Sequence, residues 1–226
     1  MSSETKNVHY EHPDVVGSRN RLGLILILVA DIAFALSILF VYFYLRQQNV
    51  NGMWLPIATE ETPAVKPVNS IGAWQITVIC LLGLIFNRFA ESGAREKQSA
   101  KVNLGTAAAL VAAVVGLVMQ IMQMNSTGFT TRMGTYASCY YLIAILNAVH
   151  LSITTFVALG NWNRGRLGLY QSDFWHLSIS RVWWIWMAVS SGAEKHQGYA
   201  FQWFALAVAA LLFWLVTGLK RKDFER

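Results

Sequence analysis

The segment from Leu22 to Leu45 is a run of 24 residues that is apolar almost throughout and carries one charge, Asp31, in its interior. About 20 residues at a rise of 1.5 Å each cross the hydrocarbon layer of a bilayer, so this run predicts a membrane-spanning helix. An aspartate near the middle of such a helix costs roughly 2.5–3.5 kcal/mol on insertion scales. We therefore expect Asp31 to face other helices of the folded chain.

The composition of the whole chain is typical of a polytopic membrane protein. Of its 226 residues, 55% are hydrophobic and 13% are charged, whereas soluble domains carry about 25% charged residues. The net charge of +6 is therefore interpreted by where the lysines and arginines lie relative to the membrane. No nucleic-acid partner is expected. Cys80 and Cys139 lie in apolar runs and form neither a disulfide framework nor a CxxC motif.

The apolar runs predict an all-α fold, a polytopic membrane helical bundle of six spans. Residues 1–21 are polar and lack the apolar core of a signal peptide, so we expect a cytoplasmic N-terminal segment. A single bundle covers residues 22–219, and a basic C-terminal tail follows over 220–226. The six predicted spans are 22–45, 71–89, 102–124, 135–160, 174–191 and 199–219.

The run over 174–191 is ambiguous, because it contains His176, Arg181 and several tryptophans. It is either a span with an interior arginine or an interfacial helix with its tryptophans at headgroup depth, which leaves five spans. Six spans place thirteen lysines and arginines on the side of the N-terminus and four on the other, whereas five spans give eleven against seven. Because cytoplasmic segments are enriched in these residues, the count favours six spans and a cytoplasmic N-terminus.

This topology gives Asp31 a predicted partner. Asp31 lies about 13–14 Å from the cytoplasmic boundary along the first span, and His150 lies at about 15 Å along the fourth. Asn147 is one turn from His150 on the same helix face. Polar residues inside membranes usually pair with one another, so we expect an intramembrane polar cluster of Asp31, Asn147 and His150. The alternative is that backbone groups or water satisfy each side chain separately.

The histidines do not form a pattern that binds haem or copper. His150 and His176 are the only histidines that lie in apolar runs. The predicted topology separates their depths in the membrane by roughly 10 Å or more. No His-x3-His cluster, phosphate-binding glycine loop or nucleophile elbow is present. The residues therefore predict no metal site and no catalytic centre in this chain.

Three segments, taken in order, carry a family resemblance: LVADIAFALSILFVYFY, YYLIAILNAVHLSITTFVAL and SDFWHLSISRVWW. They resemble subunit III of the haem-copper oxidases, that is, of cytochrome c oxidase and the bo-type quinol oxidases. The first is similar to the opening helix of the short bacterial form. The second resembles the YLxTGxHGLHV helix, with His150 on its second histidine. The third resembles [YF]WHF-x-D-x-VW, with Trp175 and His176 on its Trp-His, and the order agrees over about residues 20–190.

The chain also departs from the family pattern, as a divergent member does. Asn147 replaces the first histidine of the fourth helix, and Gln123 falls on the glutamate near the end of the third. The aspartate after Trp-His is absent, and residues 178–181 stand in its neighbourhood. The last predicted span, 199–219, has no counterpart in the usual five-helix form.

The resemblance implies an accessory subunit without a cofactor of its own, packed beside a catalytic subunit I that holds haem and copper, with other oxidase subunits. It implies phospholipids held in a cleft, support for oxygen access and proton uptake, and a bacterial or archaeal cytoplasmic (inner) membrane. Asp31 takes the position of the family's membrane carboxylate, and His150 and His176 are structural contacts. Residues expected at lipid or subunit interfaces are Arg181, Trp175, Trp183, Trp184 and Trp186.

Two other functions are compatible with the same residues. An accessory subunit of a nitric oxide reductase belongs to the same superfamily. A small proton-linked membrane transporter would use Asp31 as its ion site, although the sequence shows no inverted repeat and no pair of broken helices.

Overall fold

The computed structural model describes residues 12–52, 54–58, 64–171 and 173–193. This part of the chain is helical, and it confirms the all-α helical class predicted from the sequence. The last predicted span, 199–219, the tail and most of the N-terminal segment lie outside the described residues, and the count of six spans is not confirmed. The described elements are α1 (Pro13–Gln48), η1 (Val50–Gly52), α2 (Ser70–Arg95), α3 (Ser99–Asn125), α4 (Thr135–Arg166) and α5 (Trp175–Ala193).

The helices begin and end where local chemistry permits it, and most extend beyond the predicted spans. Pro13 opens α1, where its missing N–H costs nothing. Asn69 caps α2 by accepting a hydrogen bond from the Ile71 N–H at 3.0 Å. A tight turn joins α2 to α3 and places Lys97 in the left-handed region, at φ 56°. The longer helices carry residues that the sequence assigned to loops, Glu91 among them, into helical positions.

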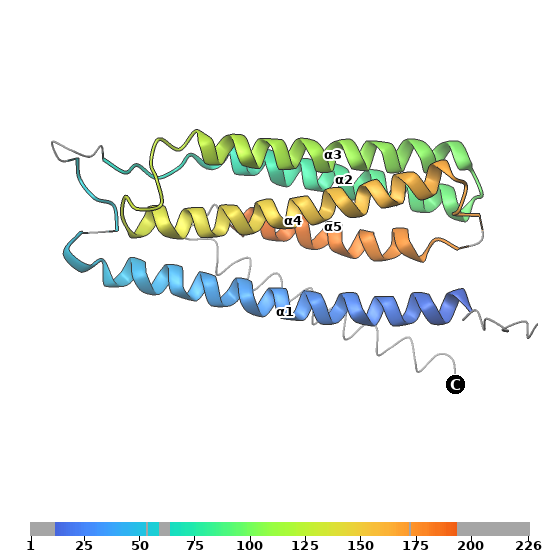
Figure 1. The fold of residues 1–226 in the computed structure, drawn as a ribbon, viewed down its shortest axis with the longest axis horizontal. Helices are drawn as coiled ribbons and strands as arrows, with labels where there is room; N and C mark the ends of the chain where they lie inside the picture. The colour runs from blue at the N-terminus through green and yellow to red at the C-terminus, as the bar shows by residue number, and fades with distance from the viewer. Residues whose placement is uncertain (1–11, 53, 59–63, 172, 194–226) are drawn as a thin grey trace, which may run out of the picture.

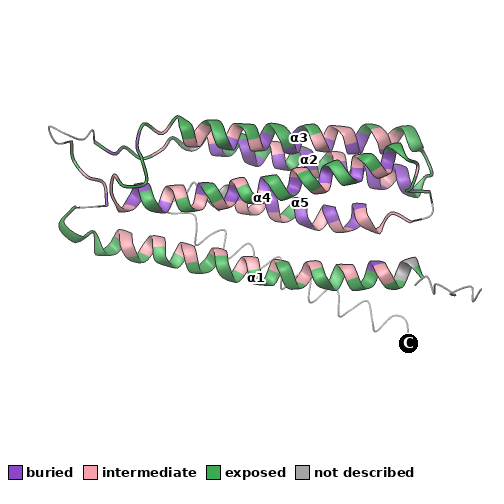
Figure 2. Ribbon diagram, in the orientation of Figure 1, coloured by how far each residue is buried: buried purple, intermediate pink, exposed green. Residues whose placement is uncertain are grey.

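Four helices pack closely, and one lies beside them. In Figure 1, α2, α3, α4 and α5 run side by side along the long axis, and α1 lies along one flank, where it packs against α4 and α5. Figure 2 shows buried residues concentrated in the four-helix part, whereas α1 is mostly exposed or intermediate. By length and composition, α1 to α4 are each able to cross a membrane.

Small residues allow the helices to approach closely. A Cβ on Gly105 would lie 2.7 Å from the Ala90 backbone nitrogen, so α2 and α3 touch through their backbones there. A Cβ on Gly83 would lie 2.3 Å from the Trp184 ring, which means that this indole lies directly against α2 at Gly83. Trp184 is 2% exposed, and α5 therefore belongs to the core of the bundle. Among the described helices, however, α5 does not qualify as a membrane span by length and composition, so a spanning segment over 174–191 stays a prediction.

Aromatic side chains close the end of the bundle that lies opposite the chain's first helical residues. Trp54 of the α1–α2 connection packs edge-on against Tyr42 and Tyr136, at ring-centroid distances of 5.0 and 5.8 Å. The Tyr136 N–H donates to the Trp54 carbonyl oxygen at 3.2 Å, and the Tyr136 hydroxyl accepts from the Val68 N–H at 2.9 Å. These contacts fix the α1–α2 connection on the start of α4. Through Tyr42 they also hold the C-terminal end of α1.

Candidate functional site

The intramembrane carboxylate of α1 contacts two other helices. The Nε2 atom of His150 on α4 lies 3.1 Å from Oδ1 and 3.0 Å from Oδ2 of Asp31. The indole N–H of Trp186 on α5 donates to Oδ2 at 2.6 Å. The Asp31 side chain is 15% exposed, so the carboxylate is mostly enclosed by these contacts. Asp31 therefore joins three helices at one point.

Neighbouring groups hold His150 in position. The Trp183 ring lies beside the imidazole, with centroids 5.8 Å apart. The Trp183 N–H donates to the Thr154 hydroxyl at 2.8 Å, and that hydroxyl donates to the His150 carbonyl oxygen at 2.7 Å. The Thr154 hydroxyl thus holds the Trp183 ring, and that ring packs beside the imidazole of His150.

The structure brings Asp31 and His150 together but not Asn147, which the predicted cluster included. The Asn147 side-chain amide donates to Gln120 of α3 at 2.6 Å, and both side chains are buried. Three residues along a helix leave two side chains about 60° apart around its axis, and here that offset separates the α3 side, which Asn147 faces, from the α1 side, which His150 faces. Asn147 joins α4 to α3, whereas His150 joins α4 to α1. Trp186, which the sequence assigned to an interface, takes the third place in the cluster.

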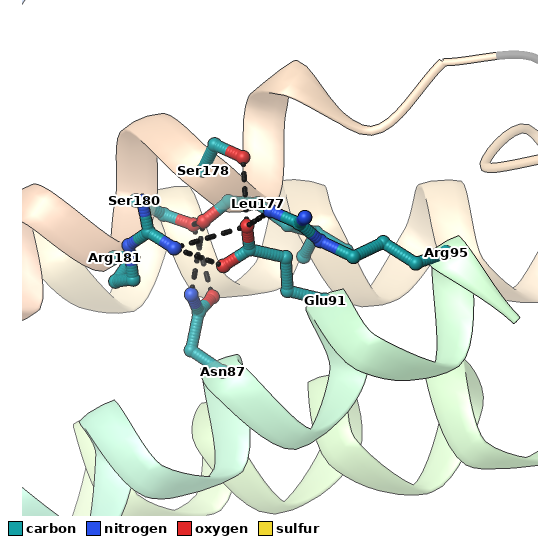
Figure 3. A network of polar contacts seen from close by, with 7 residues as sticks. All are labelled: Asn87, Glu91, Arg95, Leu177, Ser178, Ser180 and Arg181. Carbon is teal, nitrogen blue, oxygen red and sulfur yellow. Dashed lines mark hydrogen bonds and ion pairs between the residues drawn. The ribbon is translucent and has the colours of Figure 1, made fainter. Parts of the chain in front are cut away.

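A second carboxylate lies between α2 and α5, and the sequence interpretation missed it (Figure 3). The Arg181 Nη1 atom of α5 donates to Oε2 and Oε1 of Glu91, at 2.9 and 3.1 Å. The Ser178 hydroxyl donates to Oε1 at 3.0 Å, and Arg95 reaches it from the next turn of α2 at 2.8 Å. The Glu91 side chain is 4% exposed. This Glu91 cluster places the arginine of α5 against a buried negative charge.

A separate chain of hydrogen bonds lies beside the Glu91 cluster. The Ser180 hydroxyl donates to Asn87 Oδ1 at 2.9 Å, and the Asn87 amide donates to the Leu177 carbonyl oxygen at 3.0 Å. Asn161 of α4 donates to the Ser180 hydroxyl at 2.9 Å, and the Tyr170 hydroxyl donates to Asn161 at 2.9 Å. Burial raises the pKa of Tyr170, so the phenol remains a donor at neutral pH.

The Trp-His pair begins α5 and contacts α1. The Trp175 and His176 rings stack, with centroids 3.5 Å apart. A Cβ on Gly17 would lie 3.1 Å from the Trp175 Cβ, so the start of α1 packs on this tryptophan. His176 Nδ1 lies 3.5 Å from Asp173 Oδ1, beyond ordinary hydrogen-bond length. His176 and His150 occupy separate clusters.

Two of the tryptophans predicted at interfaces lie in the core. Trp183 and Trp184 are 7% and 2% exposed, and the expected interfacial role does not fit them. Arg181 remains partly exposed beside its contact with Glu91. Among the described residues, no three histidine, cysteine or acidic side chains lie close enough together to hold a metal ion.

One pattern in the sequence indicates the buried polar contacts of α4. Asn147, Thr154 and Asn161 follow one another at intervals of seven residues on α4, and all three are buried. A seven-residue repeat places side chains on one helix face. Each has a different partner, namely Gln120, Trp183 and Ser180. Glu91 gave no such signal, because it lies among the charged residues that follow the predicted second span.

Comparison with known proteins gives one family. The family described as "Cytochrome c oxidase subunit III" matches residues 1–190 of this chain. No curated protein matches this chain. The matched range covers every described helix except the last three residues of α5.

Proposed function

We propose a function for this chain from its family, because the chain belongs to the cytochrome c oxidase subunit III family. In this proposal it is a non-catalytic accessory subunit of a respiratory haem-copper terminal oxidase. The family resemblance seen in the sequence is confirmed by the match over residues 1–190. That match is the observation that carries the proposal. It implies a multi-pass membrane protein that associates with other oxidase subunits in a complex.

The catalytic partner in this proposal is a subunit I that holds the haems and copper. This chain supplies a packed bundle, α2 to α5, whose buried polar groups are largely paired with one another. Such a bundle suits a supporting role, because side chains on one helix fix the position of the next. Haem and copper are assigned to the partner, and the chain is given no catalytic step of its own.

The Asp31 cluster supports a lipid-holding and proton-handling role. Asp31 joins the flanking α1 to α4 and α5, and most of the apolar surface of α1 is left for lipid or other subunits. We place the proposed phospholipids, and the support of oxygen access and proton uptake, on this side of the bundle. The partial exposure of Arg181 leaves room for a lipid phosphate, and Trp175 and His176 serve as structural contacts.

The basic connections support a cytoplasmic N-terminus. The α2–α3 and α4–α5 connections lie at the same end of the bundle as the start of α1 (Figure 1). The α2–α3 connection contains Lys97, and the helix ends at these connections carry Arg95, Lys101, Arg164 and Arg166. Lysine and arginine accumulate in cytoplasmic segments of membrane proteins, so this end is assigned to the cytoplasm of a bacterium or archaeon.

An accessory subunit of a nitric oxide reductase is the second candidate. At Asn147 and at residues 178–181 the chain differs from the usual oxygen-reductase pattern, so this related complex is kept as the alternative. Both candidates have the same architecture and differ in the gas that the partner reduces.

Co-purification from native membranes tests the proposed function. The tagged chain is extracted in mild detergent and examined for bound subunits and for a reduced-minus-oxidised haem spectrum. We expect a multi-span haem subunit in stoichiometric amount, and the consumption of oxygen or nitric oxide by the isolated complex then separates the two candidates. Isolation of a haem-free homo-oligomer with proton-linked uptake activity would instead establish the transporter.

A further inference from the structure

The fifth helix carries an arginine and several serines, yet it lies in the core. Among the described helices, α1 to α4 have the length and composition of membrane spans, and α5 does not. Its sequence includes four serines and Arg181. Nevertheless α5 runs alongside the other helices (Figure 1), and its Leu177 and Met187 are fully buried. Something outside α5 must therefore compensate for its polar groups.

Neighbouring helices supply that compensation near both ends of α5. Ser178 bonds Glu91, and Ser180 bonds Asn87, both on α2. At the other end of α5, the Ser191 hydroxyl lies 3.2 Å from that of Thr77, also on α2. Hydrogen bonds with another helix satisfy groups that hydrocarbon cannot satisfy. The polar side of α5 is thus matched mainly by α2.

The charge of Arg181 has one described carboxylate partner. Both oxygens of Glu91 lie within 3.1 Å of the Arg181 Nη1 atom. Figure 3 shows the guanidinium extending from α5 to the carboxylate on α2. Arg95 also bonds Glu91, but its side chain is 59% exposed, so water can solvate it at the end of α2. Arg181 lies deeper along its helix and depends more on Glu91.

We propose that α5 is a conditional membrane span, which is retained in the bundle because Glu91 of α2 neutralises Arg181. The helix α2 precedes α5 in the chain, so its carboxylate is in place before α5 is inserted. Without that carboxylate, α5 combines an unpaired arginine with a modest apolar content and shifts toward the membrane surface. The inference rests on the geometry of α2 and α5 and is independent of the proposed oxidase partnership.

Cysteine accessibility in native membranes tests this proposal. Ile185 lies ten residues into α5, about 15 Å from its start, and its side chain is 46% exposed on the outside of the described bundle. Ile185→Cys is introduced into the full chain and treated with a membrane-impermeant maleimide. The chain without this substitution measures the background from Cys80 and Cys139, which are both buried. We expect protection in the parent and a roughly tenfold or greater rise in the ratio of labelled to protected chain in Glu91→Gln.

Two further variants show whether the effect runs through the ion pair. Adding Arg181→Met to Glu91→Gln removes the unpaired charge, and we expect it to restore protection. Glu96→Gln is the matched control, because Glu96 pairs with Lys101 in the exposed α2–α3 region and should leave protection unchanged. Unchanged protection in Glu91→Gln would overturn the proposal, as would a double variant that is labelled as strongly as Glu91→Gln. If Glu91→Gln is degraded, recovery of its membrane level by Arg181→Met supports the proposal and lack of recovery overturns it.

Discussion

Two carboxylates lie inside this bundle, and they connect helices of different kinds. Glu91 is almost completely enclosed and is bonded by two arginines and a serine, between two helices of the core. Asp31 is more exposed and is bonded by an imidazole and an indole, between the core and the flanking α1. The first contact compensates the charge of Arg181 on a helix that does not qualify as a membrane span by length and composition. The second positions a helix that is apolar enough to span the membrane without help.

The largest effect is expected at the core carboxylate. Glu91→Leu leaves Arg181 without its charge partner, and breaking a buried ion pair from one side costs about 3–5 kcal/mol. Thermal unfolding of the purified chain in detergent measures the loss. Replacing both members, with Glu91→Leu and Arg181→Leu together, should recover most of the stability. A Glu91→Leu chain as stable as the parent would remove the distinction between the two carboxylates.

The next largest loss of stability is expected where Trp184 packs against Gly83. Gly83→Ala forces its methyl group into the indole ring, and overpacking of this kind costs about 1–3 kcal/mol. Gly160→Ala is the control, because nothing lies within 4 Å of its added Cβ on α4. Alanine in a helix interior is favoured over glycine by roughly 0.5–1 kcal/mol, so the control should be neutral or stabilising. Equal unfolding temperatures for the two variants would show that α5 does not sit tightly on α2.

The flanking carboxylate should matter less for stability. Asp31→Asn keeps the shape but weakens the contacts with His150 and Trp186, and we expect a loss of about 1–2 kcal/mol. Thermal unfolding of the purified chain in the same detergent measures the loss. Trp186→Phe removes one of the two contacts and should cost less than Asp31→Asn. A loss at Asp31 equal to that at Glu91 would contradict the ranking.

The smallest effect is expected at the uncharged pair between α3 and α4. Asn147 and Gln120 form one hydrogen bond, and bonds of this kind between membrane helices average about 0.6 kcal/mol, with a maximum of about 1.7. A double-mutant cycle with Asn147→Ala and Gln120→Ala in thermal unfolding measures the coupling. A coupling energy larger than that of the Asp31 contacts would show that charge does not determine which polar contact contributes most to stability.

The difference between the two carboxylates also explains what the sequence reveals. Asp31 is conspicuous because it interrupts an otherwise apolar run, and matched depths along two antiparallel helices indicated His150. Glu91 has no such background, since charged residues surround it, and only the continuation of α2 through residue 95 turns it inward. The existence of each described helix was predictable from hydropathy. Which neighbour each polar side chain meets was not predictable, because an offset of about 60° around the helix axis changes the partner, as Asn147 and His150 show.

The measurement that tests this account most directly is a pair of double-mutant cycles in one preparation. One cycle combines Glu91→Leu with Arg181→Leu, and the other combines Asp31→Leu with His150→Leu, with unfolding free energies measured for every variant in the same detergent. The account predicts that the coupling energy of Glu91 and Arg181 is at least about twice that of Asp31 and His150. Equal coupling energies, or a larger value for Asp31 and His150, would contradict it.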